Sequence, residues 1–333
     1  MKKQICLLVC LALCIACQNK DNVPAYKDAS LSIETRVSDL LSRMTIEEKF
    51  GQLFMVPADL SEGLQKYNAG IFGFQLNTSS SGTQQILDYS EGGEAEQTAQ
   101  LANKIQKYFL EETRLGIPII PFDEALHGLV RKGATAYPQA IGLAATWDTT
   151  LVKEVAHAIA TETKTRGIRQ ILSPVLNIAR DVRWGRTEET YGEDPFLTTQ
   201  MGTSFIAEFE KKGIITTPKH FVANVGAGGR DSYPIHYNER LLEEVYFPAF
   251  KAAFHKAGAW SVMTSYNSLD GRPCTANDWL LNQKLKSEWG FDGFVISDAN
   301  AVGITNLIHF TTQDYADAGK QSIENGLDVI FEV

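Results

Sequence analysis

From about residue 45 onward, short apolar runs alternate with longer segments of helical periodicity. Eight of these runs are rich in β-branched and aromatic residues and are predicted to be strands. They cover residues 53–56, 70–74, 117–120, 170–172, 213–216, 260–263, 293–296 and 327–330. The segments between them predict helices at about 97–113, 148–166, 196–211, 239–257, 278–288 and 313–325. This alternation is typical of an α/β protein built from βα units, and eight strands indicate a closed (β/α)8, TIM-like barrel.

Glycine marks the expected end of the helix before several strands. The residues are Gly116, Gly167, Gly213, Gly258, Gly290 and Gly326. Glycine is favoured there because helices often end on a left-handed residue. A doubly wound open sheet is the alternative fold, but no G-x-G-x-x-G follows the first strand. The glycine-rich segment 226–229 also lacks the Gly-Lys-Ser/Thr ending of a phosphate loop, so nucleotide binding loses its main support.

The sequence ends at Val333, directly after the eighth predicted strand. A closed barrel needs helices over the outward apolar faces of its strands. We therefore expect a barrel without its last outer helix, in a chain that is either a fragment or one part of a larger protein.

The first residues predict an export signal. A short cationic start precedes an apolar run over residues 5–16, which is too short to span a bilayer of about 30 Å as a helix. The segment Cys-Ile-Ala-Cys17 resembles a bacterial lipoprotein cleavage box, although its first cysteine stands where the box prefers leucine. We expect residues 1–16 to be a signal peptide, Cys17 to carry a lipid and residues 17–37 to form a tether and lead-in. The protein would then lie in the bacterial cell envelope, on the periplasmic side or at the surface, and contact the membrane only through its lipid anchor. An ordinary secretory signal is the alternative.

Composition narrows the possible partners. The formal charge is −9, from 31 basic and 40 acidic residues, and no basic stretch follows residue 3, which argues against nucleic acid. Cys274 is the only cysteine beyond the N-terminal segment, so neither an intramolecular disulfide nor a thiolate zinc site is expected. The histidines and carboxylates show no ligand spacing such as H-E-x-x-H, and we expect neither a metal nor a cofactor.

Polar residues follow five of the predicted strands, at the strand ends where a parallel barrel carries its chemistry. They are Asp123 and Glu124 after the third strand, Asn177 and Arg180 after the fourth, Lys219 and His220 after the fifth, Tyr266 after the sixth and Asp298 after the seventh. Because these strand ends meet at one face of a barrel, the side chains are expected to converge. Arginine, lysine and carboxylate groups can each bridge neighbouring hydroxyls, so such a pocket suits a sugar.

Four longer motifs resemble those of a known family. They are Arg180-Asp-Val-Arg-Trp-Gly-Arg186, Thr187-Glu-Glu-Thr-Tyr-Gly-Glu-Asp-Pro195, Lys219-His-Phe221 and Gly293-Phe-Val-Ile-Ser-Asp298. Over residues 38–333 the sequence is similar to the N-terminal barrel domain of family 3 glycoside hydrolases. The resemblance implies a retaining, exo-acting β-glycosidase, most often a β-glucosidase or a β-xylosidase. Its substrate would be the non-reducing end of an oligosaccharide, or an aryl β-glycoside.

The same resemblance implies roles for individual residues. Asp298 would be the nucleophile that forms a covalent glycosyl intermediate, whereas its alternative role is to cap the next helix. The residues implied to contact the sugar are Glu124, Arg131, Arg180, Lys219, His220, Met263 and Tyr266. Met263 fits core packing equally well, and Arg131 lies one residue further from Glu124 than the family pattern has it. Structural ion pairing with nearby carboxylates is the alternative for Arg180 and for Lys219 and His220.

Three departures from the family pattern bear on activity. Ala299 follows the implied nucleophile where many relatives carry tryptophan, which removes an aromatic platform for a sugar. The loop over residues 222–231 contains no histidine, which disfavours the branch of the family that acts on N-acetylglucosaminides. Retaining hydrolysis also needs a second carboxyl group, which most of the family takes from a sandwich-like domain after the barrel. An inactive, truncated sugar-binding remnant without this general acid is therefore the alternative function.

Other polar residues are expected to support the fold. Those predicted to brace loops are His127 and Trp184. Those predicted to form a buried or half-buried ion network in the loop after the fourth strand are Asp181, Arg183, Arg186 and Glu188. No role is expected for His157, His255 or His309.

Overall fold

The computed structural model describes residues 23–58, 60–76, 79–81, 86–88, 94–226 and 233–332. The predicted signal peptide and Cys17 lie outside these residues. The chain divides between Phe50 and Gly51 into two compact units. Within the described ranges, no helix is both long enough and apolar enough to cross a membrane.

The first unit is helical. It contains the short turn η1 (Ala25–Lys27), helix α2 (Ile33–Arg43) and the start of α3 (Ile46–Gly51). Ser32 caps α2, because its side chain accepts a hydrogen bond from the backbone N–H of Thr35. These helices precede the first predicted strand, which begins at residue 53, and the sequence pattern did not predict them.

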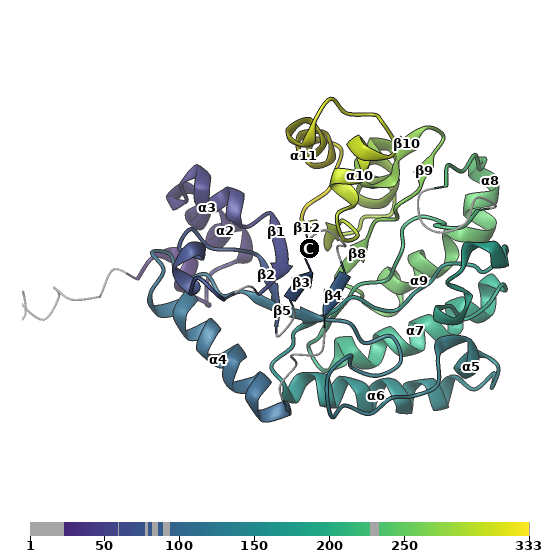
Figure 1. Cartoon of the computed structure of the whole chain (residues 1–333), viewed down its shortest axis with the longest axis horizontal. Coiled ribbons are helices and arrows are strands. Elements are labelled where there is room, and N and C mark those ends of the chain that lie inside the picture. The colour runs from purple at the N-terminus through teal and green to yellow at the C-terminus, as the bar shows by residue number, and fades with distance from the viewer. Residues whose placement is uncertain are drawn as a thin grey trace, which may run out of the picture. The chain divides into compact units, whose positions relative to one another are not determined.

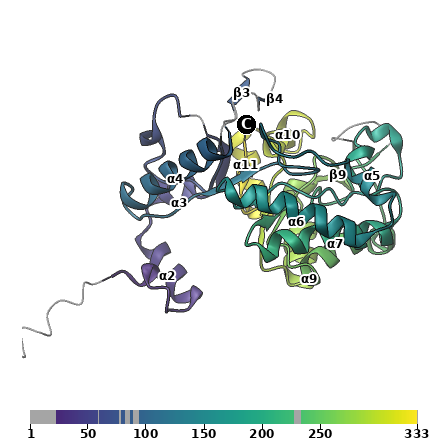
Figure 2. The same cartoon turned by 90° about the horizontal axis from the view of Figure 1, so that it is seen from below.

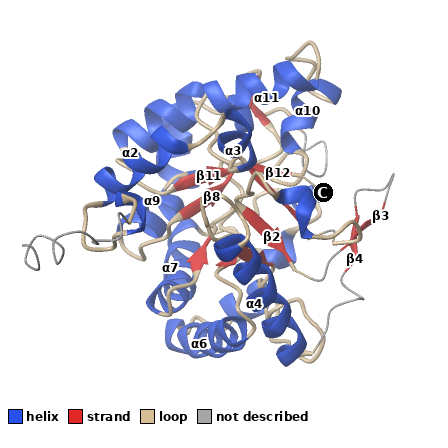
Figure 3. Ribbon diagram, turned by 90° about the vertical axis from the view of Figure 1, so that its left-hand side faces the viewer, coloured by secondary structure: helices blue, strands red, loops and turns tan. Residues whose placement is uncertain are grey.

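All eight predicted strands are present in the second unit, and all are parallel (Figures 1 and 3). Six form one sheet in the order β12 (Ile330–Phe331), β1 (Phe54–Pro57), β2 (Gly73–Gln75), β5 (Ile120–Asp123), β6 (Gln170–Ile171) and β7 (Ile215–Thr216), while β8 (Ser261–Met263) pairs with β11 (Phe294–Ile296). Isolated parallel bridges join Phe221 to Thr264 and Ile296 to Val329. Through these bridges the β8–β11 pair contacts the segments that follow β7 and precede β12.

The third strand begins later than its apolar pattern predicts. Pro118 has no N–H to donate to a neighbouring strand, and regular pairing with β2 starts at Ile120. Asp123 is therefore the last residue of β5, and Glu124 is the first residue after it. Two small antiparallel pairs lie outside the main sheet: β3 (Ser79–Ser81) with β4 (Ile86–Asp88), and β9 (Ser268–Leu269) with β10 (Arg272–Pro273).

Helices lie around the strands, with α4, α6, α7 and α9 on the outside in Figure 1. The longer ones are α4 (Ala95–Glu111), α6 (Thr149–Thr165), α7 (Pro195–Lys211), α9 (Pro248–His255), η8 (Trp279–Glu288), α10 (Ala301–Leu307) and α11 (Tyr315–Glu324). The shorter ones are η2 (Leu64–Tyr67), α5 (Ala140–Ala144), η4 (Val182–Trp184), η5 (Thr187–Glu189), α8 (Glu239–Leu241), η6 (Leu242–Tyr246) and η7 (Cys274–Ala276). The elements predicted at 97–113, 148–166, 196–211, 278–288 and 313–325 are thus confirmed as α4, α6, α7, η8 and α11.

The helix predicted over residues 239–257 is present over residues 239–255, as α8, the π-helical segment η6 and α9 in direct succession. Pro248 has no N–H with which to continue a regular α-helix. Just before it, the N–H of Phe247 donates to the carbonyl of Leu242, five residues back, at 2.8 Å. This wider π-type turn accommodates the proline within a continuous helical path.

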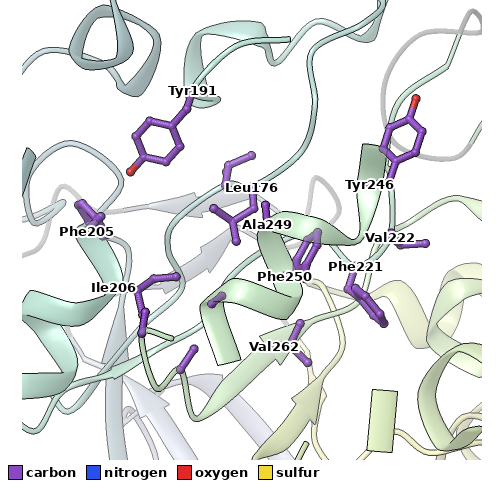
Figure 4. Close-up of a cluster of buried hydrophobic side chains, with 14 of the residues drawn as sticks. Leu176, Tyr191, Phe205, Ile206, Phe221, Val222, Tyr246, Ala249, Phe250 and Val262 are labelled. Carbon is purple, nitrogen blue, oxygen red and sulfur yellow. The ribbon is translucent and has the colours of Figure 1, made fainter. Parts of the chain in front are cut away.

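The main hydrophobic core lies between the sheet and three outer helices. Helix α7 packs between α6 and α9, which Figure 2 shows from below. Phe205 of α7, Phe250 of α9 and Val262 of β8 belong to the same buried cluster (Figure 4). The helices therefore cover one face of the strands and do not cover the strand ends at which the candidate site lies.

A smaller core fills the inside of the curled sheet. The rings of Phe122 on β5 and Phe331 on β12 meet edge to face with their centroids 5.3 Å apart, although β1 and β2 separate these strands in the sheet. Met55 and Met263 belong to the same buried cluster. Side chains from distant strands can meet in this way only if the sheet curls around them.

The six glycines predicted to end helices all adopt the left-handed conformation. Their φ angles lie between 65° and 108° at Gly116, Gly167, Gly213, Gly258, Gly290 and Gly326. At Gly167 a Cβ atom would also lie 2.9 Å from the side chain of Ala102. The prediction that glycine ends the preceding helix is confirmed at Gly167, Gly213, Gly290 and Gly326, each of which directly follows a helix C-cap. Gly258 lies two residues past the C-cap of α9, and the prediction is wrong at Gly116, because α4 ends at Glu111.

The close approach of β8 and β11 provides a test of the fold. A Cβ atom on Gly293 would lie 2.2 Å from the carbonyl oxygen of Trp260. We expect Gly293→Ala to lower the free energy of unfolding by about 1–3 kcal/mol, because the strands must separate. Urea denaturation measures this change. Gly319→Ala in α11 is the matched control, since its Cβ would meet open space and alanine favours the helix by up to about 1 kcal/mol. Equal effects of the two substitutions would contradict the expectation.

Candidate active site

Lys219 and His220 form the centre of the candidate site, because two carboxylates from different strand ends meet them. They follow β7, and their residues are only 3% and 1% exposed. Glu124, which follows β5, contacts Lys219, and Asp298, which follows β11, contacts His220. The structure therefore brings together four of the residues that the sequence predicts for the site.

Glu124 is held by one ion pair. Lys219 Nζ donates to Glu124 Oε1 at 2.7 Å. Burial raises the pKa of Glu124, and the Lys219 ammonium opposes this rise. The second oxygen, Oε2, is buried and has no hydrogen-bond partner among the residues that the structure describes. A buried acceptor without a partner is costly, so Oε2 is suited to accept a hydrogen bond from a ligand hydroxyl.

A second ion pair lies close to Glu124. Arg186 and Glu189 form a bidentate pair, with Nε to Oε1 and Nη2 to Oε2 both at 2.7 Å. Arg186 lowers the pKa of Glu124 and Glu189 raises it, so the two charges of this pair act on Glu124 in opposite directions. The pair therefore adds fixed hydrogen-bonding groups beside Glu124 with little net charge.

The ion network predicted for the loop after the fourth strand is wrong in its partners. Arg183 pairs with Asp181 at 2.6 Å, but the two side chains are 64% and 25% exposed rather than buried together with Arg186. Glu188 is exposed, and the neighbouring Glu189 pairs with Arg186 instead. The reason is local, because a single 3₁₀ turn directs Glu189 back toward the residue three positions earlier.

Asp298 is fixed by the turn that follows β11. Its Oδ2 lies 3.4 Å from Nε2 of His220, and its Oδ1 accepts a hydrogen bond of 2.8 Å from the N–H of Ala299. Asn300 is left-handed, with φ at 58°, and its N–H donates to the carbonyl of Phe331 at 2.9 Å. Asn300, not Asp298, occupies the N-cap position of α10. The Asp298 side chain therefore faces His220 instead of capping the next helix.

Tyr266 connects the turn after Asp298 to the segment after β8. Its hydroxyl donates to the carbonyl of Ala299 at 2.8 Å. Its own carbonyl oxygen lies 2.7 Å from Nε2 of His309, so that nitrogen must carry a proton. Burial lowers the pKa of His309, which favours the neutral ring. No role was expected for His309, yet it contacts a predicted site residue across 43 positions of sequence, which a local pattern does not reveal.

Arg131 lies beneath Glu124. Its Nε is 2.6 Å from Oδ2 of Asp123, and both side chains are fully buried. Another guanidinium nitrogen donates to the carbonyl of Leu76. Burial raises the pKa of Asp123 to about 7, against the opposing charge of Arg131. Asp123 in turn accepts from the N–H of Glu124 at 2.9 Å, so this ion pair supports the position of Glu124.

Met263 and Arg180 make their observed contacts outside the Lys219–Glu124 and His220–Asp298 pairs. Met263 is 1% exposed and packs in the cluster inside the sheet, in agreement with the core-packing alternative. Arg180 is exposed and interacts with Tyr246, whose pKa is raised by burial. Contacts of Met263, Arg180 and Arg131 with a sugar remain predictions.

Asn177 is a site residue to which the sequence pattern assigned no role. It is 1% exposed and binds His220 with both ends of its amide. Its Oδ1 accepts from the backbone N–H of His220 at 3.0 Å and lies 2.8 Å from the ring Nδ1. Its Nδ2 donates to the carbonyls of His220 and Ala223 at 2.9 and 3.0 Å. The only sequence signal for it was its place after the fourth strand.

The two residues predicted to brace loops are confirmed in structural positions. His127 and Tyr137 join two loop segments, since Tyr137 N–H donates to the His127 carbonyl at 2.7 Å and the His127 ring contacts the Tyr137 carbonyl at 3.0 Å. Trp184 is fully buried, with the guanidinium of Arg186 5.9 Å from its ring centroid. The described part of the chain contains no group of three or more His, Cys, Asp or Glu residues that could hold a metal ion.

Buried carboxylates and cations at the ends of curled parallel strands define an α/β protein of the kind that binds and transforms small polar molecules. Comparison with known families narrows this class. The chain belongs to glycosyl hydrolase family 3, because residues 45–333 match the N-terminal domain of that family.

Individual relatives agree with the family match. The chain is 31% identical to a putative β-xylosidase of Formosa agariphila, over 94% of this chain and 42% of that protein. It is 32% identical to a periplasmic β-glucosidase of Salmonella typhimurium, over 88% and 37%. A β-glucosidase structure from Erythrobacter marinus superposes with a TM-score of 0.84 at 31% identity, covering 94% of this chain and 42% of that one. The β-glucosidase of Listeria innocua, solved with glucose, has a TM-score of 0.75 at 30% identity over 90% and 42%. The chain thus spans less than half the length of these proteins.

The ion pair between Lys219 and Glu124 can be tested without an activity assay. We expect Lys219→Met to lower the free energy of unfolding by about 2–3 kcal/mol at neutral pH, because Glu124 is left buried without its cation. The loss should grow as the pH rises above 4.5, the ordinary pKa of glutamate. Removal of the ammonium raises the folded-state pKa of Glu124 further, and an acid with a raised pKa costs stability once the unfolded chain is ionised. Thermal unfolding from about pH 5 to 8 measures the difference from wild type.

The control for this pair is the double variant Lys219→Met with Glu124→Gln. It removes both charges, so we expect it to regain much of the stability at neutral pH and to lose the dependence on pH. A difference between wild type and Lys219→Met that stays constant over the pH range would show that Glu124 does not carry the effect.

Proposed function

We propose that the protein is a retaining exo-β-glycosidase of the β-glucosidase type. The observation that carries this proposal is that Glu124 and Asp298, from two separated strand ends, contact the adjacent residues Lys219 and His220. Two carboxylates beside a lysine and a histidine provide a nucleophile and a set of groups that bind hydroxyls. The family match over residues 45–333 and the β-glucosidases and β-xylosidases among the relatives support the same reaction.

In this proposal Asp298 is the nucleophile. One carboxylate oxygen attacks the anomeric carbon while the bond to the leaving oxygen breaks, and the leaving oxygen takes a proton from a general acid. A water molecule then attacks the same carbon from the other side, loses a proton to the conjugate base and releases the sugar, which restores the Asp298 carboxylate. The N–H of Ala299 at 2.8 Å stabilises that carboxylate before attack, and His220 at 3.4 Å does so when its ring carries both protons. We assign the general acid to no residue of this chain.

The sugar is proposed to lie between the two carboxylates. Glu124 would accept a hydroxyl proton through its buried Oε2, and Lys219 and His220 would donate to neighbouring hydroxyls. Tyr266 would line the same pocket while its hydroxyl remains bound to the turn after Asp298. Three further residues would act at greater distance. Arg180 would lie at the rim of the pocket, Arg131 would support Glu124 from beneath, and Met263 would pack below the sugar.

We propose further that the eight strands close into a (β/α)8 barrel over residues 38–333. The bridges from Phe221 to Thr264 and from Ile296 to Val329 support closure, because they join the β8–β11 pair to both sides of the six-stranded sheet.

We also propose that residues 1–16 are an export signal and that Cys17 is lipidated. The relative from Salmonella typhimurium named periplasmic supports a location outside the cytoplasm. Incorporation of labelled palmitate that depends on Cys17 is the test of the anchor.

The identity of the sugar is the finer part of this proposal. A neighbouring structure was solved with glucose, which favours a β-glucoside, whereas two relatives named as β-xylosidases favour a pentose. Glucose and xylose differ only in the hydroxymethyl group at C5, so the same contacts to the ring hydroxyls serve both. The ratio of kcat/KM for 4-nitrophenyl β-glucoside and β-xyloside decides between them.

Covalent trapping tests the nucleophile. A 2-fluoro β-glycoside with a good leaving group should add the mass of one fluorosugar to the peptide that contains Asp298, which mass spectrometry of a digest detects. Asp298→Asn should show no label and should lose roughly 10³-fold or more of the activity toward aryl glycosides. Asp292→Asn is the matched control, because it makes the same change in an exposed residue just before β11 and should be labelled like wild type.

Two results would overturn the assignment. Label found in Asp298→Asn at the wild-type rate would place the nucleophile elsewhere. Folded wild-type protein that takes up no label, but binds glucose or xylose in calorimetric titration, would instead support a role in sugar binding alone.

A further inference from the structure

The amide of Asn177 has only one orientation that fits its surroundings. One end of the amide lies 2.9 and 3.0 Å from two backbone carbonyls, those of His220 and Ala223, which can only accept hydrogen bonds. The other end lies 3.0 Å from the backbone N–H of His220, which can only donate. Three backbone groups therefore determine the orientation of the amide. Nδ2 faces the carbonyls of His220 and Ala223, and Oδ1 faces the backbone N–H of His220.

This orientation determines the proton on the His220 ring. Oδ1 of Asn177 is an acceptor and lies 2.8 Å from Nδ1 of His220, so Nδ1 must carry a proton for the contact to be favourable. The other ring nitrogen, Nε2, then faces Asp298 Oδ2 at 3.4 Å. Both residues are almost completely buried, at 1% exposure each for Asn177 and His220, so water does not easily replace this hydrogen bond.

We propose that Asn177 is a positioning residue that keeps Nδ1 of His220 protonated and presents Nε2 to Asp298 and to the bound sugar. A neutral ring in this state accepts a hydrogen bond at Nε2, as from a sugar hydroxyl. A ring that carries both protons donates from Nε2 to the Asp298 carboxylate. The residue before His220, Lys219, is paired with Glu124 at 2.7 Å. Nε2 of His220 can therefore donate to Asp298 in the free site and accept a hydrogen bond from a sugar hydroxyl in the occupied site.

Two variants of Asn177 separate positioning from simple packing. Asn177→Asp keeps an acceptor for Nδ1 and for the His220 N–H, but it cannot donate to the carbonyls of His220 and Ala223. Asn177→Leu is of similar size and removes the acceptor. We expect the Nδ1 proton to persist in Asn177→Asp and to be lost from a large share of molecules in Asn177→Leu.

Nitrogen NMR reads the proton directly. The chain has six histidines, and in ¹⁵N-histidine-labelled full-length protein at about pH 8 the ring nitrogens of His220 are identified by their loss in His220→Gln. Protonated and unprotonated ring nitrogens give well separated shifts. An unprotonated Nδ1 in the wild type overturns the proposal, and so does a Nδ1 proton that persists in Asn177→Leu. If Asn177→Leu does not fold, the wild type and Asn177→Asp still decide it.

The kinetic consequence rests on the proposed function, whereas the NMR result does not. With the 2-fluoro glycoside, we expect the rate of covalent labelling to fall by about 10–100-fold in Asn177→Leu, the effect of losing one hydrogen bond to a charged group. We expect Asn177→Asp to recover most of that rate. A changed proton position with an unchanged labelling rate would refute the positioning role. No labelling in any variant, with the expected NMR result, would refute the proposed reaction and leave the inference about Asn177 intact.

Discussion

The site depends on the burial of two adjacent polar side chains, a lysine and a histidine. A lysine with 3% exposure and a histidine with 1% exposure lose most of their hydration, and the free energy of that loss must be offset by anionic or hydrogen-bonding partners. Glu124 provides this for Lys219, and Asp298 and Asn177 provide it for His220. Since these partners come from three other strand ends, the requirement for partners also determines how those strand ends converge.

Backbone groups supply much of the rigidity around these pairs. The Asp298 carboxylate accepts from a backbone N–H, the Tyr266 hydroxyl donates to a backbone carbonyl, and the Asn177 amide uses three backbone groups. Such partners move less than exposed side chains do, so the charges are held in place before any ligand arrives. Arrangements of this kind reduce the reorganisation that accompanies the development of charge in a reaction.

The sequence predicted the parts of the fold and site that depend on local pattern. Apolar runs located all eight strands, and four glycines with left-handed backbone located helix ends. Polar residues after the strands correctly indicated Glu124, Lys219 and Asp298 as neighbours of one site, because parallel strands carry their ends to the same face.

Other features depend on geometry that a local pattern does not contain. Regular pairing of β5 begins only at Ile120, and the helix before β8 widens into a π-type turn just before Pro248. The choice of Glu189 over Glu188 as partner of Arg186 follows from the direction of a single turn. The contacts of Asn177 with His220 and of His309 with Tyr266 each join residues 43 positions apart, and they become visible only when the sheet brings the two segments together.

The backbone and the side chain of Ala299 have different roles in the turn that follows Asp298. Its N–H is bound to the Asp298 carboxylate and its carbonyl to the Tyr266 hydroxyl, while its methyl group packs against the buried cluster that contains Met263 and Ile296. Both hydrogen bonds use backbone groups, so any residue other than proline can make them at this position. If Asp298 is the nucleophile, as proposed, an aromatic side chain at position 299 would narrow the space beside the anomeric carbon, whereas alanine leaves it open, and this position would then help to select the leaving group.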